Sequence, residues 1–155
     1  MADVQLLRVT ATEKQAFMEL CLPYNRELNP AFEPSPHWRE TYFETAVNNP
    51  AAELFWISTD APAGFVLLGH QEHQFRPGLL IGYIYDFYIK PDSRNSGVAQ
   101  EGARLAIEHL FQAGCSRIQL EVLHSNERAV RFWDRLGFKS KVARYVLEGE
   151  GADGG

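Results

Sequence analysis

The chain has 155 residues, of which 45% are hydrophobic and 23% are charged, a usual balance for a globular protein. We expect one domain over residues 1–148, followed by a disordered, glycine- and acid-rich tail at 149–155. The formal net charge is −5 and no run of Lys or Arg is present, which argues against nucleic acid as a partner.

The sequence also argues against a membrane or secreted protein. The N-terminal MADVQLLRV has no basic region followed by an apolar core, so we predict no signal peptide, and no apolar run reaches membrane-spanning length. Cys21 and Cys115 fit neither a disulfide nor a metal spacing, and both lie in apolar contexts that favour packing. The expected location is the cytoplasm, with no membrane contact.

In chain order, a short strand is expected around residues 4–9. The pattern Thr10-x-x-Glu13 predicts the capping box of a helix. Pro23 should kink or end this helix, so residues 25–36 are expected to form a loop.

A second helix should begin at Ser35-Pro36 as N-cap and first helical residue, and end at Asn48-Asn49-Pro50. Its aromatic and small residues share one face, which fits either a core face or the wall of a pocket: Trp38, Tyr42, Phe43 and Ala46.

Residues 52–59 and 64–69 read as a hairpin, and the polar residues 70–78 as an exposed loop. His70 and His73 lie in this loop, but no carboxylate or Cys partner has a convincing metal-ligand spacing, so we expect no metal site.

The most informative stretch is LLIGYIYDFYIKPDSRNSGVAQEGARLAIEHLFQAG, residues 79–114. It reads as a dense aromatic and β-branched strand, a turn after Pro91, and a helix that begins near Ala99 and stops at Gly114. A glycine-bearing turn before a helix N-terminus binds anions, because the first N–H groups of the helix have no internal partner. An ordinary strand-to-helix connection is the alternative from these residues alone.

The remaining elements are a strand over residues 117–123, a helix over 126–136 with Ser125 or Asn126 as its N-cap, and a final strand near 143–147. The order of elements predicts an α/β fold with a mixed, mostly antiparallel sheet and helices on both faces.

Two motifs carry a family resemblance. The R-x-x-G-x-A pattern at residues 94–99 resembles the acetyl-CoA motif of GNAT-type N-acetyltransferases. The segment Leu120-Glu121-Val122 followed by NERAVRFWDRLGF resembles the second conserved block of that family, in the same order and separation. The chain departs from the family at Trp133, where a Tyr is usual.

The resemblance implies the GNAT acyl-CoA N-acyltransferase fold, with acetyl-CoA as cosubstrate and a small-molecule or peptide amine as acceptor. Pantetheine would lie in a wedge between the central strand and its parallel neighbour. The residues implied in cofactor binding are Phe87, Tyr88 and Ile89 on the strand, Arg94, Asn95, Ser96, Gly97, Val98 and Ala99 in the turn, and Asn126 and Trp133 in the later helix. Asn126 could instead be a plain N-cap, and Trp133 a core residue. A homodimer is also compatible with the family.

Transfer to an amine requires a group that removes a proton, and two carboxylates are equal candidates. Glu121 lies in the L-E-V block, and Asp86 lies in the central strand beside the expected thioester. Asp86 and Tyr88 should share one face of that strand unless a bulge intervenes. His124 is a third candidate, because histidine side chains in general suit proton transfer near neutral pH.

Two readings of function stay open at this point. The first is an active N-acetyltransferase, and the second is a catalytically impaired CoA-binding or regulatory module, motivated by Trp133. Transfer of a different acyl group is a weaker third.

Overall fold

The computed structural model describes residues 3–150, including the path of the helix around Arg39 but not that side chain. The predicted tail at 149–155 therefore lies largely outside the described residues. The described chain forms two compact units, the first ending at Glu121 and the second beginning at Val122. Each unit is described by itself.

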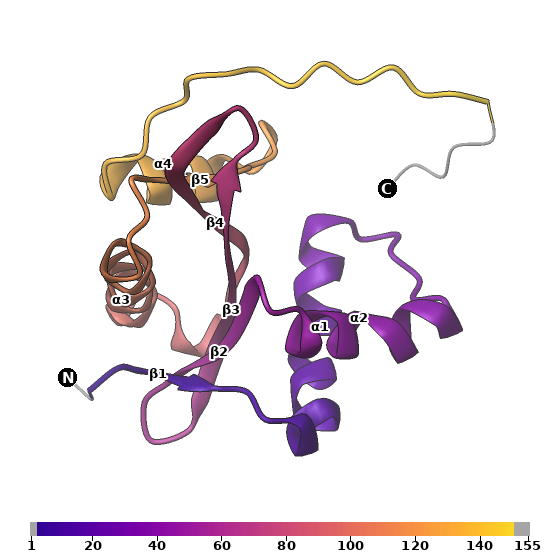
Figure 1. The fold of residues 1–155 in the computed structure, drawn as a ribbon. Coiled ribbons are helices and arrows are strands. Elements are labelled where there is room, and N and C mark those ends of the chain that lie inside the picture. The colour runs from indigo at the N-terminus through magenta and orange to yellow at the C-terminus, as the bar shows by residue number, and fades with distance from the viewer. Residues whose placement is uncertain (1–2, 151–155) are drawn as a thin grey trace. The chain divides into compact units, whose positions relative to one another are not determined.

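The first unit is built on one five-stranded sheet in the order β1-β2-β3-β4-β5 (Figure 1). The strands are β1 (Gln5–Arg8), β2 (Ala52–Ser58), β3 (Pro62–His73), β4 (Arg76–Ile89) and β5 (Arg117–Leu120). The first four strands pair antiparallel, and β5 runs parallel to β4. The predicted mixed, mostly antiparallel sheet is confirmed.

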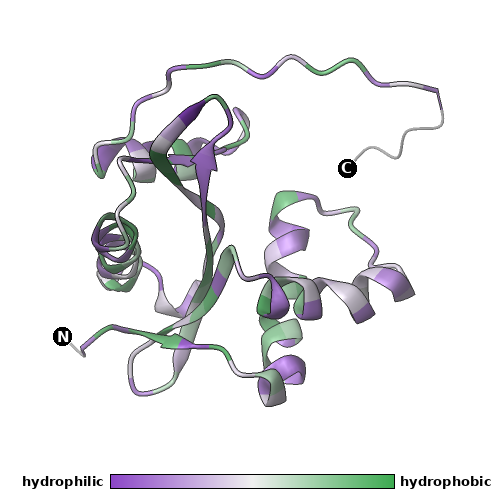
Figure 2. Ribbon diagram, viewed as in Figure 1, coloured by the Kyte–Doolittle hydropathy of each residue, from purple (hydrophilic) through white to green (hydrophobic). Residues whose placement is uncertain are grey.

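One face of the sheet is covered by α1 (Lys14–Leu28), which follows a short 3-10 turn at Ala11–Glu13, and by α2 (Pro36–Asn48). Phe17 of α1 is fully buried and packs edge-on against Phe65 of β3, with ring centroids 4.8 Å apart. Trp56 of β2 and Phe43 of α2 complete this aromatic core. Figure 2 shows the hydrophobic character of the central strands that carry it.

The prediction that Pro23 kinks or ends the first helix is wrong. α1 continues through Pro23 to Leu28, so the loop before α2 covers only residues 29–35. Pro23 is exposed, whereas Cys21 and Tyr24 on either side of it pack inward. The burial of these neighbours stabilises helical backbone on both sides of a residue that cannot donate its own hydrogen bond.

The opposite face of the sheet is covered by α3 (Val98–Gln112). Gly102 of α3 lies directly over Ile57 of β2, where an added Cβ would come within 2.9 Å of a side-chain carbon. Ala103, Ala106 and Leu110 of the same helix are fully buried. Helices therefore cover both faces of the sheet in this unit, as the sequence predicts. Ser35 also caps α2 as predicted, accepting a 3.1 Å hydrogen bond from the Trp38 N–H.

The predicted exposed loop at residues 70–78 is largely wrong. β3 extends to His73 and β4 begins at Arg76, so only Gln74 and Phe75 form the tip of a long hairpin. The segment is polar because it is exposed to solvent, and a hairpin ladder forms there nonetheless through backbone hydrogen bonds.

The second unit contains α4 (Glu127–Arg135), which ends before Gly137 in the left-handed conformation (φ 99°). The predicted final strand at residues 143–147 is absent from the structure, where this segment is extended and carries no strand. A strand needs a neighbour to pair with, and this stretch has none among residues 3–150. Within the described residues, no helix has both the length and the apolar character needed to cross a membrane.

Candidate acetyl-transfer site

The sheet is irregular at the point where Asp86 lies. Asp86 pairs with Leu67 of β3, but Ile84 pairs with the next residue, Leu68, so Tyr85 is an extra residue in β4. This is a β-bulge, which re-aims the side chains that follow it. Asp86 and Tyr88 both face α1, because the Tyr24 side chain of that helix contacts each of them. The prediction that they share one face is confirmed.

The Asp86 carboxylate is held by two tyrosine hydroxyls. Tyr24 of α1 donates to Asp86 Oδ1 at 2.8 Å, and Tyr42 of α2 donates to Asp86 Oδ2 at 2.6 Å. The three residues come from three elements, so the packing of both helices on the sheet sets the position of the carboxylate. Charge-assisted hydrogen bonds of this length are among the stronger ones in proteins.

Burial and the negative charge of Asp86 raise the pKa of both Tyr24 and Tyr42 far above the ordinary tyrosine value. Both hydroxyls therefore stay protonated and act as donors at any ordinary pH. Cys21 lies in the same region, where burial and the Asp86 charge raise the pKa of its thiol to about 12. The thiol is uncharged at neutral pH, which fits the predicted packing role.

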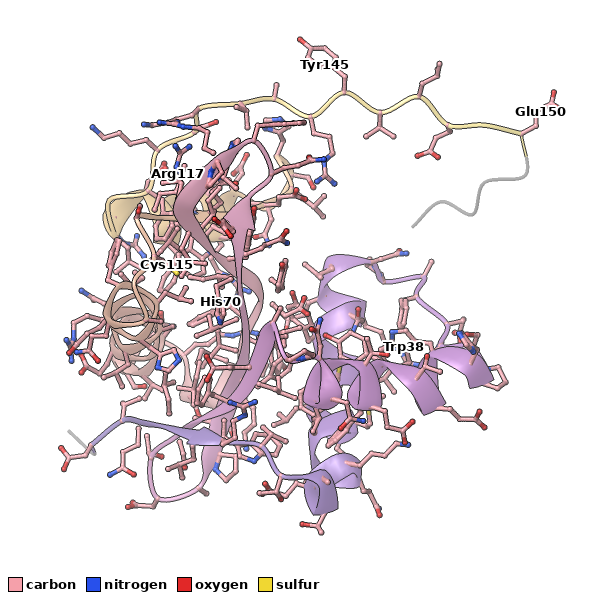
Figure 3. The ribbon with its side chains drawn as sticks, in the orientation of Figure 1. Trp38, His70, Cys115, Arg117, Tyr145 and Glu150 are labelled. Atoms are coloured by element: carbon pink, nitrogen blue, oxygen red, sulfur yellow. The ribbon has the colours of Figure 1, made fainter. Side chains whose placement is uncertain are left out.

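A groove of about 470 Å³ is lined by residues of the 3-10 turn, α1, the loop before α2, and α2: Thr12, Lys14, Gln15, Met18, Leu22, Pro34 and Trp38. The Trp38 ring is 5.5 Å from the Tyr42 ring, and Figure 3 labels Trp38 among the side chains of this helix. The residues on the predicted aromatic face of α2 therefore have different roles. Phe43 and Ala46 are core residues, Tyr42 holds Asp86, and Trp38 lines the groove.

The turn after β4 has the backbone of an anion site. Asn95 and Gly97 both adopt positive φ, 63° and 85°, and Gly97 is the N-cap of α3. The first intrahelical bond runs from the Glu101 N–H to the Gly97 carbonyl, so helix geometry leaves the preceding amides without internal acceptors. A side chain at a φ of 85° is strained, which explains the glycine.

The Arg94 guanidinium, predicted to supply charge at this turn, is engaged by protein groups. It forms a two-pronged ion pair with Glu27 of α1 at 2.6 and 2.9 Å, and its Nε donates to the Ile89 carbonyl at 2.9 Å. It also lies over the Tyr88 ring, 5.6 Å from the centroid. Arg94 thus joins the end of α1 to the end of β4.

β4 extends beyond its parallel neighbour. The pairing with β5 joins Ile81–Ile84 to Arg117–Leu120, and β4 continues to Ile89. Phe87, Tyr88 and Ile89 therefore lie past the last β4–β5 pair. A backbone edge at this point, next to an amide-rich turn, fits the elongated pantetheine and pyrophosphate of acetyl-CoA.

The other predicted residues lie elsewhere in the chain. β5 ends at Leu120, three residues earlier than predicted, so Glu121 is an exposed residue just after the strand. His124 is exposed in the second unit. Asn126 caps α4 by accepting a 3.2 Å hydrogen bond from the Ala129 N–H. Trp133 is buried and packs edge-on against Phe132 and Phe138.

Sequence reasoning missed the roles of Tyr24 and Tyr42. Tyr42 lies on the helix face predicted to be either core or pocket wall, and a tyrosine hydroxyl that becomes buried needs a hydrogen-bond partner. This requirement could have indicated from the sequence that a hydrogen-bond partner exists, but it does not identify Asp86 as the partner.

The chain is similar in sequence to known acetyltransferases. A profile of the "Acetyltransferase (GNAT) family" matches residues 15–138. The pig thialysine N-epsilon-acetyltransferase is 31% identical over 93 residues, covering 58% of this chain and 52% of that protein. The N-alpha-acetyltransferase 30 of Schizosaccharomyces pombe is 26% identical over 149 residues, covering 95% of each chain. The chain spans just over half the length of the first curated relatives it matches.

Solved structures share the fold. A putative acetyltransferase from Agrobacterium tumefaciens superposes with a TM-score of 0.76 at 18% identity, covering 94% of this chain and 99% of that one. At this identity the likeness shows the fold alone. With the family profile over most of its length, an α/β sheet of this topology and the glycine turn at the start of α3, the chain belongs to the acetyltransferase (GNAT) family.

Proposed function

We propose that the protein is an N-acetyltransferase that transfers the acetyl group of acetyl-CoA directly to a primary amine of a small molecule, peptide or protein. The observation that carries the proposal is the Asp86 carboxylate, which Tyr24 and Tyr42 hold on the part of β4 that lies beyond its last pair with β5. A fixed carboxylate beside the expected acetyl position suits a positively charged amine.

The residues present fit acetyl-CoA. Bound acetyl-CoA supplies a thioester, whose C–S bond breaks as the amide bond to the acceptor forms. The backbone of Phe87, Tyr88 and Ile89 would hold the pantetheine, and a backbone N–H there would stabilise the oxyanion. The turn amides would hold the pyrophosphate at Arg94, Asn95, Ser96, Gly97, Val98 and Ala99. Asn126 and Trp133 of α4 stay the later residues that the family pattern implies in cofactor binding.

Asp86 is the better candidate for the group that receives the amine proton. Each carboxylate oxygen has two lone pairs, so the tyrosine hydrogen bonds leave acceptor capacity on both oxygens. The same bonds fix the carboxylate in one orientation, which a positioned acid–base group needs. Glu121, exposed just after β5, is the second candidate.

The names of two relatives support an amine acceptor, since one describes transfer to an ε-nitrogen and the other to an α-nitrogen. We also propose a cytoplasmic location, because Cys21 and Cys115 are free, buried thiols. The proposed acceptor surface includes the Trp38 groove, which lies next to the tyrosine that holds Asp86.

A catalytically impaired CoA-binding module is the alternative, and the observation that favours it is Trp133 in place of a tyrosine. An indole has one N–H donor and no proton that it can give up at neutral pH. A thiol has an ordinary pKa of about 8.5, so the CoA thiolate can leave without a dedicated acid. Activity therefore does not require a tyrosine at position 133.

The test is turnover of acetyl-CoA by the purified chain with a panel of primary amines. The amide product is measured by mass spectrometry, and acetyl-CoA binding is measured separately by calorimetry. Formation of the acetylated amine supports the proposed N-acetyltransferase. Binding of acetyl-CoA with no product from any amine in the panel supports the catalytically impaired CoA-binding module.

A further inference from the structure

A pair of stacked tyrosine rings lies beside the Asp86 carboxylate. The Tyr83 and Tyr85 rings are parallel to within 4°, and their centroids are 5.5 Å apart. Tyr85 is the extra residue of the bulge in β4, directly before Asp86, and it is 49% exposed. A large aromatic side chain that stays half open to solvent beside a polar group is suited to contact with a ligand.

Both rings lie on the same face of the sheet as Asp86. Asp86 pairs with Leu67 of β3, and Leu67 packs against the aromatic core under α1 and α2. Tyr83 pairs with Gly69, two residues further along β3 and therefore on the same face. The Tyr85 ring stacks on Tyr83 and lies over Gly69, so it shares this face as well.

The absence of a side chain at Gly69 makes room for the Tyr85 ring. A Cβ added to Gly69 would overlap Tyr85 Cε2. The ring therefore packs directly on the backbone of β3, with Tyr83 against one of its faces. The ring face turned away from Tyr83 is left for a partner that stacks in the same way.

The hydrogen bonds to Asp86 come from the side of the helices. Tyr24 of α1 and Tyr42 of α2 each hold one of its oxygens, so their side chains occupy that approach. On the strand itself, the exposed neighbour of Asp86 is Tyr85. An amine that pairs with the carboxylate thus brings the group attached to it against the Tyr85 ring.

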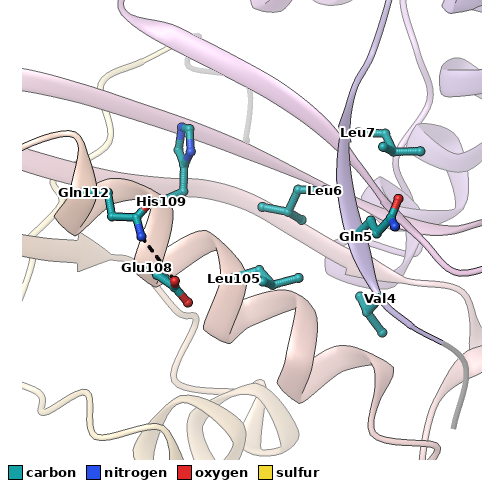
Figure 4. A pocket seen from close by; sticks show the side chains of 8 residues that line it. All are labelled: Val4, Gln5, Leu6, Leu7, Leu105, Glu108, His109 and Gln112. Atoms are coloured by element: carbon teal, nitrogen blue, oxygen red, sulfur yellow. Dashed lines mark hydrogen bonds between the residues drawn. The ribbon is translucent and has the colours of Figure 1, made fainter.

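Two grooves in the molecule are less suited to hold that group. The groove of about 410 Å³ between β1 and α3 is lined by Leu6, Leu105 and His109 among others, and α3 covers the opposite face of the sheet (Figure 4). The sheet would separate a ligand there from Asp86. The Trp38 groove has neither Asp86 nor Tyr85 among its lining residues.

We infer that the acceptor is a primary amine with an aromatic ring two carbon atoms from the nitrogen, and that this ring stacks on Tyr85 while the ammonium group pairs with Asp86. The inference rests on the proposed function and names the substrate class of the same site. Adjacent strand residues are about 3.4 Å apart along the strand, a span that two carbon atoms between ring and nitrogen cover. The same 2-arylethylamine skeleton occurs in free amines and in peptides whose first residue is aromatic.

The first measurement compares phenethylamine with 2-cyclohexylethylamine, which has the same skeleton without the aromatic ring. For wild type, kcat/KM should be about 3- to 10-fold higher for phenethylamine, through a lower KM, because stacking acts on binding. Tyr85→Phe keeps the ring and should keep this preference, whereas Tyr85→Ala should remove it with acetyl-CoA affinity unchanged. Equal use of the two amines by wild type, or a preference that survives in Tyr85→Ala, overturns the inference.

A second variant moves the ring without removing it. Gly69→Ala displaces the Tyr85 ring and keeps both tyrosines, so it should reduce the preference as Tyr85→Ala does. Phe75→Ala is the matched control, because it removes a ring that is 79% exposed at the tip of the β3–β4 hairpin, and it should keep the preference. If Trp38→Ala loses the preference and Tyr85→Ala keeps it, the aromatic ring binds in the Trp38 groove and the inference is wrong.

A binding measurement distinguishes failure of this inference from failure of the proposed function. Calorimetric titration of phenethylamine into the protein saturated with CoA needs no turnover. Binding that weakens about 3- to 10-fold in Tyr85→Ala supports the inference even if no amine is acetylated, and absence of binding overturns it. Acetylation of both amines with equal kcat/KM overturns the inference and leaves the proposed function in place.

The source of the aromatic amine is identified by a pair of peptides. One begins with phenylalanine and the other with leucine, and the rest of their sequence is the same. A higher kcat/KM for the phenylalanine peptide than for free phenethylamine assigns a peptide acceptor. The reverse order, with the preference for phenethylamine over 2-cyclohexylethylamine, assigns a free aromatic amine. A leucine peptide that is used better than both aromatic acceptors overturns the inference.

Discussion

The Tyr42 hydroxyl donates a 2.6 Å hydrogen bond to Asp86, 44 residues further along the chain. This bond joins α2 to the central strand at its bulge, and Tyr24 makes the equivalent bond from α1. The helices that cover the sheet thus also orient the carboxylate to which we assign the acceptor amine.

Removal of these donors should disturb both stability and acceptor use. Tyr42→Phe leaves one oxygen of a partly buried carboxylate without its donor, at a cost of about 1.5–3 kcal/mol in the free energy of unfolding. The KM for the amine should rise while acetyl-CoA affinity stays near wild type. Urea denaturation measures the change in stability, and steady-state kinetics measure the KM for the amine. Tyr83→Phe is the control, because Tyr83 lies on β4 with Asp86 but makes no hydrogen bond to it in the structure. If Tyr42→Phe and wild type show equal kinetics for the amine, the tyrosine hydrogen bonds to Asp86 have no role in the reaction.

The ion pair between Glu27 and Arg94 makes a different prediction. Glu27→Gln leaves the Arg94 guanidinium without its counter-charge beside the proposed pyrophosphate site. Acetyl-CoA affinity should rise several-fold, while stability falls by no more than about 1 kcal/mol, because the pair is partly exposed. Arg94→Ala should lower the affinity. Calorimetric titration measures both, and a fall in affinity for Glu27→Gln would show that the ion pair itself orders the turn.

The φ of 85° at Gly97 predicts a graded series. Gly97→Val should lower both stability and acetyl-CoA affinity, since a β-branched residue is strained there by about 1–2 kcal/mol and crowds the turn amides. Gly97→Asn is the matched variant, because asparagine tolerates this conformation, and its stability should be closer to wild type. If the two variants bind acetyl-CoA as wild type does, the turn is not the pyrophosphate site.

Glu13 links stability to pH. Its carboxylate accepts hydrogen bonds from the Thr10 N–H at 2.8 Å and from Trp56 Nε1 at 3.1 Å, and the Thr10 bond is the largest cause that lowers its pKa below the ordinary 4.5. A lowered folded-state pKa gives stability that is present above 4.5 and is lost as the pH falls through the folded value. Denaturation between pH 3 and 7 should show this loss in wild type and a smaller one in Glu13→Gln. Identical pH dependence would contradict the link.

The sequence predicted most of the fold because its signals are local. Ser35 before Pro36 marked the start of α2, and Gly114 and Gly137 marked the ends of α3 and α4 in left-handed backbone. Helix stops and caps depend on a few neighbouring residues, so a pattern identifies them.

The remaining features depend on tertiary partners. Pro23 lies inside α1 because its neighbours are buried, and the 143–147 segment is no strand because no described strand pairs with it. The hydrogen bonds of Asp86 join residues 44 and 62 positions apart, which no local pattern encodes. Asp86 itself was predicted from the strand, but the preference for it over Glu121 needed the two tyrosines.

The central claim is that Asp86 receives the acceptor amine in acetyl transfer, and one comparison tests it directly. Acetylation of a verified primary amine is followed for wild type, Asp86→Asn and Glu121→Gln, with acetyl-CoA affinity measured for each. We predict that Asp86→Asn loses about 10²- to 10⁴-fold in kcat/KM with acetyl-CoA binding intact, and that Glu121→Gln stays close to wild type. The opposite pattern, with Asp86→Asn active and Glu121→Gln inactive, would contradict the assignment.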